Sequence, residues 1–180
     1  MSDDHAGESA RLASGSDRLD AVLGGGLPRH GITLLIGQPG SGKTILAQQY
    51  LFHNATLESP AVYMSTVSEP LEKILRYGQS LRYFDPAALG RSVFYEDLGQ
   101  IINDDGLPGV LARLTELIQR RRPSVLVIDS FKALLADCYQ DFGPLYARLK
   151  AASDIAPGAI VAGDEVLHRG TFAYFKERSR

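Results

Sequence analysis

The sequence predicts an α/β fold in which a mostly parallel central sheet is covered by helices on both faces. Short, continuous apolar runs that are rich in β-branched residues alternate along the chain with segments of helical composition. One of these runs ends in a glycine-rich turn, and another ends in a single carboxylate. Because strands that are separated by helices favour parallel pairing, this alternation predicts a sheet that is buried on both sides.

Five runs are predicted to be strands, because each is a short apolar stretch bounded by turn residues. In chain order they are residues 32–36, 61–66, 92–96, 124–129 and the weaker 159–163. The run 124–129 has the clearest pattern, since its apolar residues are followed directly by Asp129.

Four segments are predicted to be helices: residues 45–52, a short helix opened by Pro70, residues 110–121 and residues 145–152. Pro70 suits a first helical position, and Pro123 ends the third helix. The third helix turns one apolar face inward, which consists of Val110, Leu111, Leu114, Leu117 and Ile118. We expect one domain over residues 12–180, preceded by a disordered acidic leader over residues 1–11.

Composition argues against several classes of protein. The 180-residue chain has a formal net charge of −2, whereas a nucleic-acid domain usually carries an excess of Lys and Arg. The single cysteine, Cys138, allows neither an intrachain disulfide nor a cysteine metal site. No apolar run approaches the roughly 18 residues that span a bilayer, and the N-terminus lacks the features of a secretory signal. These observations favour a cytoplasmic protein without a membrane segment.

The turn after residues 32–36 predicts a phosphate-binding loop. Its pattern is Gly37, four residues and then Gly42-Lys43-Thr44, placed between a predicted strand and a predicted helix. Glycines let consecutive backbone N–H groups point at phosphate oxygens, and the helix that follows adds its unpaired N-terminal donors. Lys43 supplies a positive charge for the outer phosphates. The predicted nucleotide-binding residues are Gly37, Gln38, Pro39, Gly40, Ser41, Gly42, Lys43 and Thr44.

Two oxygen-bearing side chains are predicted to hold Mg²⁺ together with the nucleotide. Thr44 offers a hydroxyl, and magnesium prefers oxygen ligands. Asp129 ends an apolar strand, where an acid of phosphate-loop proteins holds Mg²⁺ through water. The alternative role for Asp129 is to cap the turn after its strand. The expected cofactors are therefore ATP and Mg²⁺.

A family resemblance lies in residues 14–28, which read SGSDRLDAVLGGGLP and run into the phosphate loop. This lead-in segment resembles the G-x-x-x-L-D-x-x-L-G-G-G-L-P stretch of the KaiC-like branch of the RecA superfamily. The resemblance is dense from Gly15 to Thr44 and extends more loosely over residues 12–163. It implies a RecA-like P-loop NTPase core and assembly into homo-oligomeric rings with ATP between neighbouring subunits.

Without the family resemblance, the residues of the lead-in segment predict only local structure. Three glycines and Pro28 predict a tight, non-helical connection. Leu19, Val22 and Leu23 are expected to pack on the edge of the sheet. Nothing in these residues alone identifies ATP.

The resemblance also implies a pair of glutamates after the second strand, one of which orients the water that attacks the γ-phosphate. With Pro70 aligned to the family's proline, this sequence has Val67 and Ser68 at those two positions. Glu69 lies one residue further along and is the candidate catalytic base. Its alternative role is an acid at a helix start, where it interacts favourably with the helix dipole. We therefore expect slow ATP hydrolysis, with no hydrolysis as the alternative.

The C-terminal part is predicted to be shorter than the family's domain. Residues 167–171 resemble a basic K-x-R-G-T segment of the family, from which a residue reaches the γ-phosphate of a neighbouring subunit. Arg169 is the candidate for that role, and an exposed tail is the alternative. The segment follows Asp129 too closely for the intervening strands, so either part of the core is deleted or the resemblance is accidental.

The sequence leaves three functions open. The first is a ring-forming regulatory or signalling ATPase, with a regulatory protein as a further partner. The second is an ATP-dependent switch or scaffold that does not hydrolyse ATP. The third is a recombinase-like DNA-binding ATPase, against which the mild acidity and the lack of a basic stripe count. One architecture carries many functions, so the fold alone does not choose among them.

Overall fold

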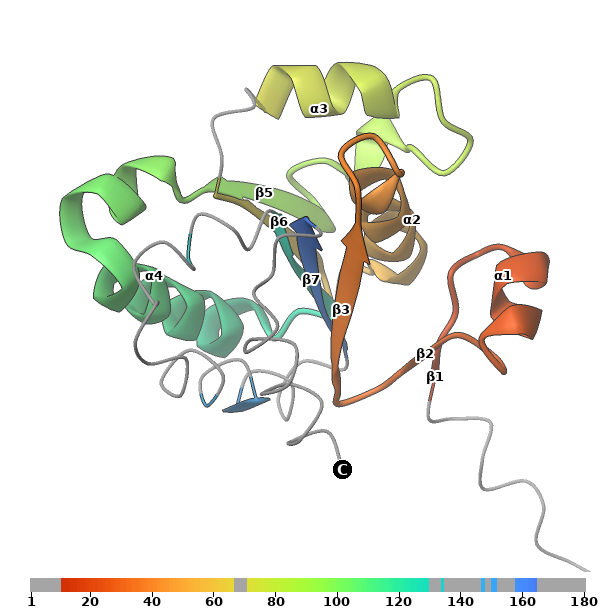
Figure 1. The fold of residues 1–180 in the computed structure, drawn as a ribbon, viewed down its shortest axis with the longest axis horizontal. Helices are drawn as coiled ribbons and strands as arrows, with labels where there is room; N and C mark the ends of the chain where they lie inside the picture. The colour runs from red at the N-terminus through yellow and green to blue at the C-terminus, as the bar shows by residue number, and fades with distance from the viewer. Residues whose placement is uncertain are drawn as a thin grey trace, which may run out of the picture.

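The computed structural model describes residues 11–66, 71–129 and 158–164, together with positions 134, 147, 150 and 151. Its centre is a five-stranded sheet of order β3-β7-β6-β4-β5, in which every neighbouring pair is parallel (Figure 1). These strands are β3 (Ile32–Gly37), β4 (Ala61–Ser65), β5 (Val93–Asp97), β6 (Val125–Asp129) and β7 (Gly158–Asp164). The predicted parallel α/β fold is confirmed, and all five predicted strands are found.

The register of the sheet gathers the carboxyl ends of the strands at one edge. Ser65 of β4 lies opposite Asp129 of β6, and Gly37 of β3 lies opposite Asp164 of β7. Each of these residues is the last of its strand. The turn after Gly37 and the carboxylate of Asp129 therefore belong to the same edge, which is where open parallel sheets bind ligands.

Helices cover both faces of the sheet, as predicted. The helices are α1 (Asp17–Val22), α2 (Lys43–Asn54), α3 (Leu71–Gly78), the short 3-10 helix η2 (Pro86–Ala88) and α4 (Gly99–Arg121), of which α2 and α4 pack on opposite faces of the sheet. The alternation of side chains along each strand decides which helix they meet. Along β4, Val62 and Met64 join the apolar cluster under α4, whereas Ala61 and Tyr63 join the cluster under α2.

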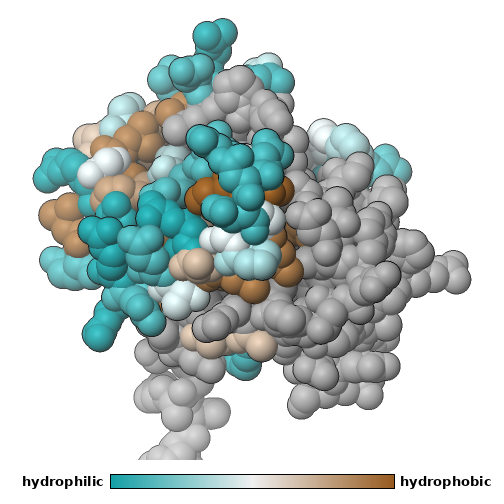
Figure 2. Space-filling model, turned by 90° about the vertical axis from the view of Figure 1, so that its left-hand side faces the viewer, coloured by the Kyte–Doolittle hydropathy of each residue, from teal (hydrophilic) through white to brown (hydrophobic). Residues whose placement is uncertain are grey.

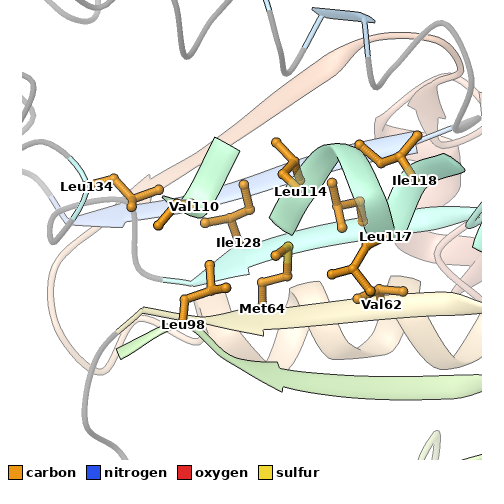
Figure 3. Close-up of a cluster of buried hydrophobic side chains, with 10 residues drawn as sticks. Val62, Met64, Leu98, Val110, Leu114, Leu117, Ile118, Ile128 and Leu134 are labelled. Carbon is orange, nitrogen blue, oxygen red and sulfur yellow. The ribbon is translucent and has the colours of Figure 1, made fainter. Parts of the chain in front are cut away.

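The cluster under α4 forms a continuous core (Figure 3). The face that α4 contributes matches the predicted one: Val110, Leu114, Leu117 and Ile118 are buried, and Leu111 is partly buried. These side chains pack against alternate residues of β4 and β6. The sequence periodicity thus identified the buried face of this helix.

α4 begins well before the helix that the sequence predicts. It starts at Gly99 and departs from helical geometry at Gly106, where φ is 59° and ψ is −153°. Pro108 follows within the same helix, and proline lacks the N–H for the helical hydrogen bond. Because glycine and proline in close succession usually end a helix, the sequence pattern predicted only the part of α4 from Val110 onward.

The predicted non-helical connection is found over residues 24–28, but the sequence did not predict the short helix that precedes it in the lead-in segment. Its strands, β1 (Arg11–Leu12) and β2 (Leu27–Pro28), pair antiparallel, and α1 lies between them. The backbone N–H of Ser14 donates to the carboxylate of Asp20 at 2.8 Å, which fixes the approach to α1. The guanidinium of Arg11 donates to the carbonyls of Leu23 and Gly26 beyond it. α1 was not predicted, because these stabilising contacts join residues that lie apart in the sequence.

The apolar residues of α1 follow the prediction only in part. Leu19 and Leu23 are partly buried against the cluster under α2, as expected. Val22 is 82% exposed, so its predicted packing on the sheet edge is wrong. Residues 1–10 of the predicted leader over 1–11, and most of the helix predicted over 145–152, lie outside the described residues, whereas Arg11 belongs to β1.

The outer surface of α4 carries linked ion pairs. Arg113 contacts Glu96 of β5 and Glu116 of α4, each at 2.8 Å, and Arg120 contacts Glu116 at 3.1 Å. Figure 2 shows the side of the molecule that carries α4, where hydrophilic side chains are interspersed with small apolar areas. Across the ranges that the structure describes, no helix has both the length and the apolar character to cross a membrane.

Candidate nucleotide site

The phosphate loop connects β3 to α2, and two of its glycines have a left-handed backbone. The angle φ is 79° at Gly40 and 89° at Gly42, which caps the N-terminus of α2. A Cβ at either position would meet nothing within 4 Å, so conformation rather than space requires glycine there. At Gly37 the reason is space, because a Cβ would lie 2.6 Å from the hydroxyl oxygen of Ser41. Left-handed turns of this kind let successive N–H groups converge on an anion.

Lys43 is the first residue of α2, and its side chain reaches back to the loop. Its Nζ donates to the carbonyl oxygens of Gly37 at 2.7 Å and Gln38 at 3.0 Å. The ammonium group is therefore held at the loop, where it can exchange these carbonyls for phosphate oxygens. The part of the loop beyond β3 is open to solvent, since its exposed residues are Gln38, Pro39, Gly40 and Ser41.

Thr44 and Asp129 meet although they lie 85 positions apart in the chain. The Thr44 hydroxyl donates to Oδ2 of Asp129 at 2.6 Å, because the start of α2 lies against the carboxyl end of β6. A hydroxyl and a carboxylate are the oxygen donors that Mg²⁺ takes, and here they lie beside a phosphate loop. The pair fits a magnesium ion that accompanies nucleotide phosphates. Its role as a metal site stays a prediction.

Tyr63 is a third member of this cluster, and the sequence predicted it only as a core residue. Its ring is buried at 1% exposure, and its hydroxyl donates to Oδ2 of Asp129 at 2.6 Å. Burial of the ring, followed by the negative charge of Asp129, raises the pKa of the Tyr63 hydroxyl far above its ordinary value. The hydroxyl thus remains a protonated donor. A tyrosine inside an otherwise apolar strand was the available signal, but its partner depends on the strand order.

A family comparison decides between a phosphate loop and a chance glycine-rich turn. The family model described as ATPase: KaiC matches residues 12–143. The chain belongs to the KaiC ATPase family. The match spans the phosphate loop, Tyr63 and Asp129, so the described cluster lies inside the part of the chain that matches a RecA-superfamily P-loop ATPase.

Similar proteins in this family and superfamily have diverse names. A UPF0273 protein of Pyrococcus horikoshii is 25% identical over 139 residues, which are 69% of this chain and 53% of that protein. The circadian clock oscillator protein KaiC of Prochlorococcus marinus is 26% identical over 157 residues, 76% of this chain and 28% of KaiC. The DNA repair protein XRCC3 of Bos taurus is 33% identical over 139 residues, 68% of this chain and 40% of XRCC3. The chain therefore spans about half or less of the length of each of these relatives.

In the sequence of this KaiC-family chain, the candidate catalytic base Glu69 follows strand β4, whose end is held by backbone hydrogen bonds. The N–H of Thr66 donates to the carbonyl of Asp129 at 2.9 Å, and the N–H of Leu98 donates to the carbonyl of Ser65 at 2.8 Å. The described backbone is therefore anchored next to Asp129 up to Thr66. Glu69 and Arg169 both lie outside the described residues, so their predicted roles stay predictions.

Proposed function

We propose that this chain binds Mg-ATP on residues 37–44 and hydrolyses it slowly, as a regulatory or signalling ATPase of the cytoplasm. The observation that carries the proposal is the 2.6 Å hydrogen bond between Thr44 and Asp129 beside the phosphate loop. It joins the hydroxyl at the start of the phosphate-binding helix to the carboxylate at the end of β6, as a nucleotide-bound Mg²⁺ requires. Membership of the KaiC ATPase family supports ATP as the nucleotide.

Phosphate binding follows from the loop and from the start of α2. The unpaired N–H groups and the positive dipole end of the helix attract negative charge. Lys43 exchanges its two loop carbonyls for phosphate oxygens, which gives charge-assisted hydrogen bonds. A bound Mg²⁺ would neutralise the charge of the phosphates. Thr44 and Asp129 are the residues that would hold it.

Hydrolysis and assembly extend this proposal beyond the described residues. Glu69 is proposed as the base that orients the attacking water. A homo-oligomeric ring with ATP between subunits would cover the open side of the loop, where Gln38 to Ser41 are exposed. A regulatory protein is a further proposed partner.

The test measures nucleotide binding and phosphate release separately, on wild type and on Lys43→Ala. Loss of the ammonium group should weaken binding of a fluorescent ATP analogue more than tenfold, since it removes charge-assisted hydrogen bonds of about 1.5–3 kcal/mol each. Phosphate release should be slow in wild type and absent in the variant. Equal binding by both proteins would overturn the proposed site. Urea unfolding of both proteins checks that the variant is folded.

A non-hydrolytic, ATP-dependent switch is the second candidate. It is favoured by Val67 and Ser68, which stand where the resemblance implies catalytic glutamates. Neither side chain is suited to orient water as a base. Tight ATP binding together with phosphate release no faster than in Lys43→Ala would favour this candidate over an ATPase.

A DNA-binding ATPase is the third candidate, and similarity to a DNA repair protein is the observation in its favour. The formal net charge of −2 counts against it. Binding to DNA phosphates weakens steeply with salt, so salt-dependent binding to single-stranded DNA would support this candidate.

A further inference from the structure

A single oxygen of Asp129 accepts two short hydrogen bonds. Oδ2 takes one from Tyr63 and one from Thr44, both at 2.6 Å. Both hydrogen bonds that Tyr63 and Thr44 donate to this carboxylate thus go to Oδ2 and not to Oδ1. The two oxygens of this carboxylate therefore have different surroundings.

The two donors differ in how firmly the fold holds them. Thr44 begins the phosphate-binding helix, where its hydroxyl oxygen is also the predicted metal ligand. Tyr63 lies on β4 beside β6 and is buried in the cluster under α2. Its ring also packs on that of Tyr95 in β5, with centroids 5.1 Å apart and planes tilted by 37°. Tyr63 is thus the donor whose position does not depend on nucleotide.

We propose that Tyr63 is a positioning residue that keeps Oδ2 of Asp129 occupied and so directs Oδ1 toward the magnesium ion and its water. This inference rests on the proposed Mg-ATP site. A carboxylate with a single flexible partner can turn about its last torsion and present either oxygen. Two donors on one oxygen remove that freedom, and the Thr44 oxygen can turn a lone pair to the metal while its O–H still donates to Oδ2.

The test is Tyr63→Phe, which keeps the buried ring and deletes only the hydroxyl. The probe is a fluorescent ATP analogue, titrated first in EDTA and then with increasing Mg²⁺. Loss of an outer-shell donor to a metal ligand typically costs 10–100-fold in metal affinity, so the Mg²⁺ midpoint should rise about tenfold or more. Affinity for the metal-free nucleotide should stay within about twofold of wild type, because the side chains that Tyr63 contacts at the site, Asp129 and Thr44, are the ones proposed to hold the metal.

Tyr95→Phe is the matched control. It deletes a buried hydroxyl from the neighbouring strand, and within the described residues that hydroxyl has no hydrogen-bond partner. Its Mg²⁺ midpoint should equal that of wild type. An equal shift in both variants would overturn the inference, because loss of packing would then explain it. An unshifted midpoint in Tyr63→Phe would overturn it directly.

The double variant separates a role through Asp129 from any other role. In an Asp129→Asn background, Tyr63→Phe should change the Mg²⁺ midpoint by less than about twofold, since the group that Tyr63 positions is already lost. If the effects of the two substitutions on the Mg²⁺ midpoint are additive, the inference is overturned. If wild type binds nucleotide but the Mg²⁺ midpoint of Tyr63→Phe is unshifted, this inference fails and the proposed function stands. If wild type does not bind nucleotide, both the proposed function and this inference fail.

Discussion

At the scale of single residues, the glycines of the phosphate loop serve two different physical purposes. Gly40 and Gly42 have left-handed backbones with open space around the missing Cβ. Gly37 has an ordinary backbone but stands too close to the Ser41 hydroxyl for a side chain. The same residue type thus provides backbone freedom at two positions and close approach at a third.

Gly42→Ala is expected to lower the free energy of unfolding by about 1–2 kcal/mol, the cost of a left-handed backbone for an alanine. It should also weaken binding of the ATP analogue, because relief of that strain moves the loop. Urea unfolding and analogue titration measure the two effects.

Gly90→Ala is the control for Gly42→Ala. Gly90 also has a left-handed backbone, with φ of 71° and nothing within 4 Å of a Cβ, but it lies in the turn before β5. It should lose a similar amount of stability and bind the analogue like wild type. If Gly42→Ala binds the ATP analogue as tightly as Gly90→Ala does, the left-handed backbone of Gly42 is not required for nucleotide binding.

At this scale, a sequence motif predicted which residues lie together, whereas their binding roles stay predictions. Residues 37–44 were identified as a phosphate loop, and Asp129 was expected beside it. The contact from Tyr63 to Asp129 was not predicted, since a buried tyrosine in an apolar strand is usually a core residue. The roles of Glu69 and Arg169 remain predictions.

At the scale of elements, local periodicity identified the strands and the buried face of α4. The spacing of apolar residues depends on a few neighbouring positions, so it can be recognised without knowledge of the rest of the fold. α1 was missed because six residues give too short a pattern, and its stabilising contacts come from Arg11 and Ser14 outside the helix. The first part of α4 was missed because Gly106 and Pro108 interrupt its pattern.

Leu114→Ala is expected to lower the free energy of unfolding by about 2–5 kcal/mol, since it leaves a cavity in the core under α4. Leu114 is 1% exposed and belongs to that cluster. Leu111→Ala, on the partly buried edge of the same helix, should cost clearly less. Urea unfolding measures both values, and equal losses would show that the packing under α4 is not as described.

At the scale of the whole molecule, the strand order decides how the site is assembled. β7 lies between β3 and β6, and β4 lies on the other side of β6. The central strand β6 therefore presents Asp129 to residues from two elements that come much earlier in the chain. Thr44 comes from α2 and Tyr63 from β4.

Light scattering with and without Mg-ATP tests the proposed ring. The mass of the wild-type particle should rise in Mg-ATP to a multiple of the single chain, because ATP would bridge the open loop to a neighbour. Lys43→Ala should show no such rise. A wild-type monomer under both conditions would contradict the ring, although it would leave nucleotide binding untouched.

By itself, the sequence determined the succession of strands and helices, the buried face of α4 and the phosphate loop. Each of these depends on residues that are close together in the chain, where periodicity and glycine content act locally. Only the tertiary structure decided the strand order and the contacts of Asp129 with Thr44 and Tyr63. Those contacts join residues that are 85 and 66 positions apart, so they follow from packing between elements and not from any local pattern.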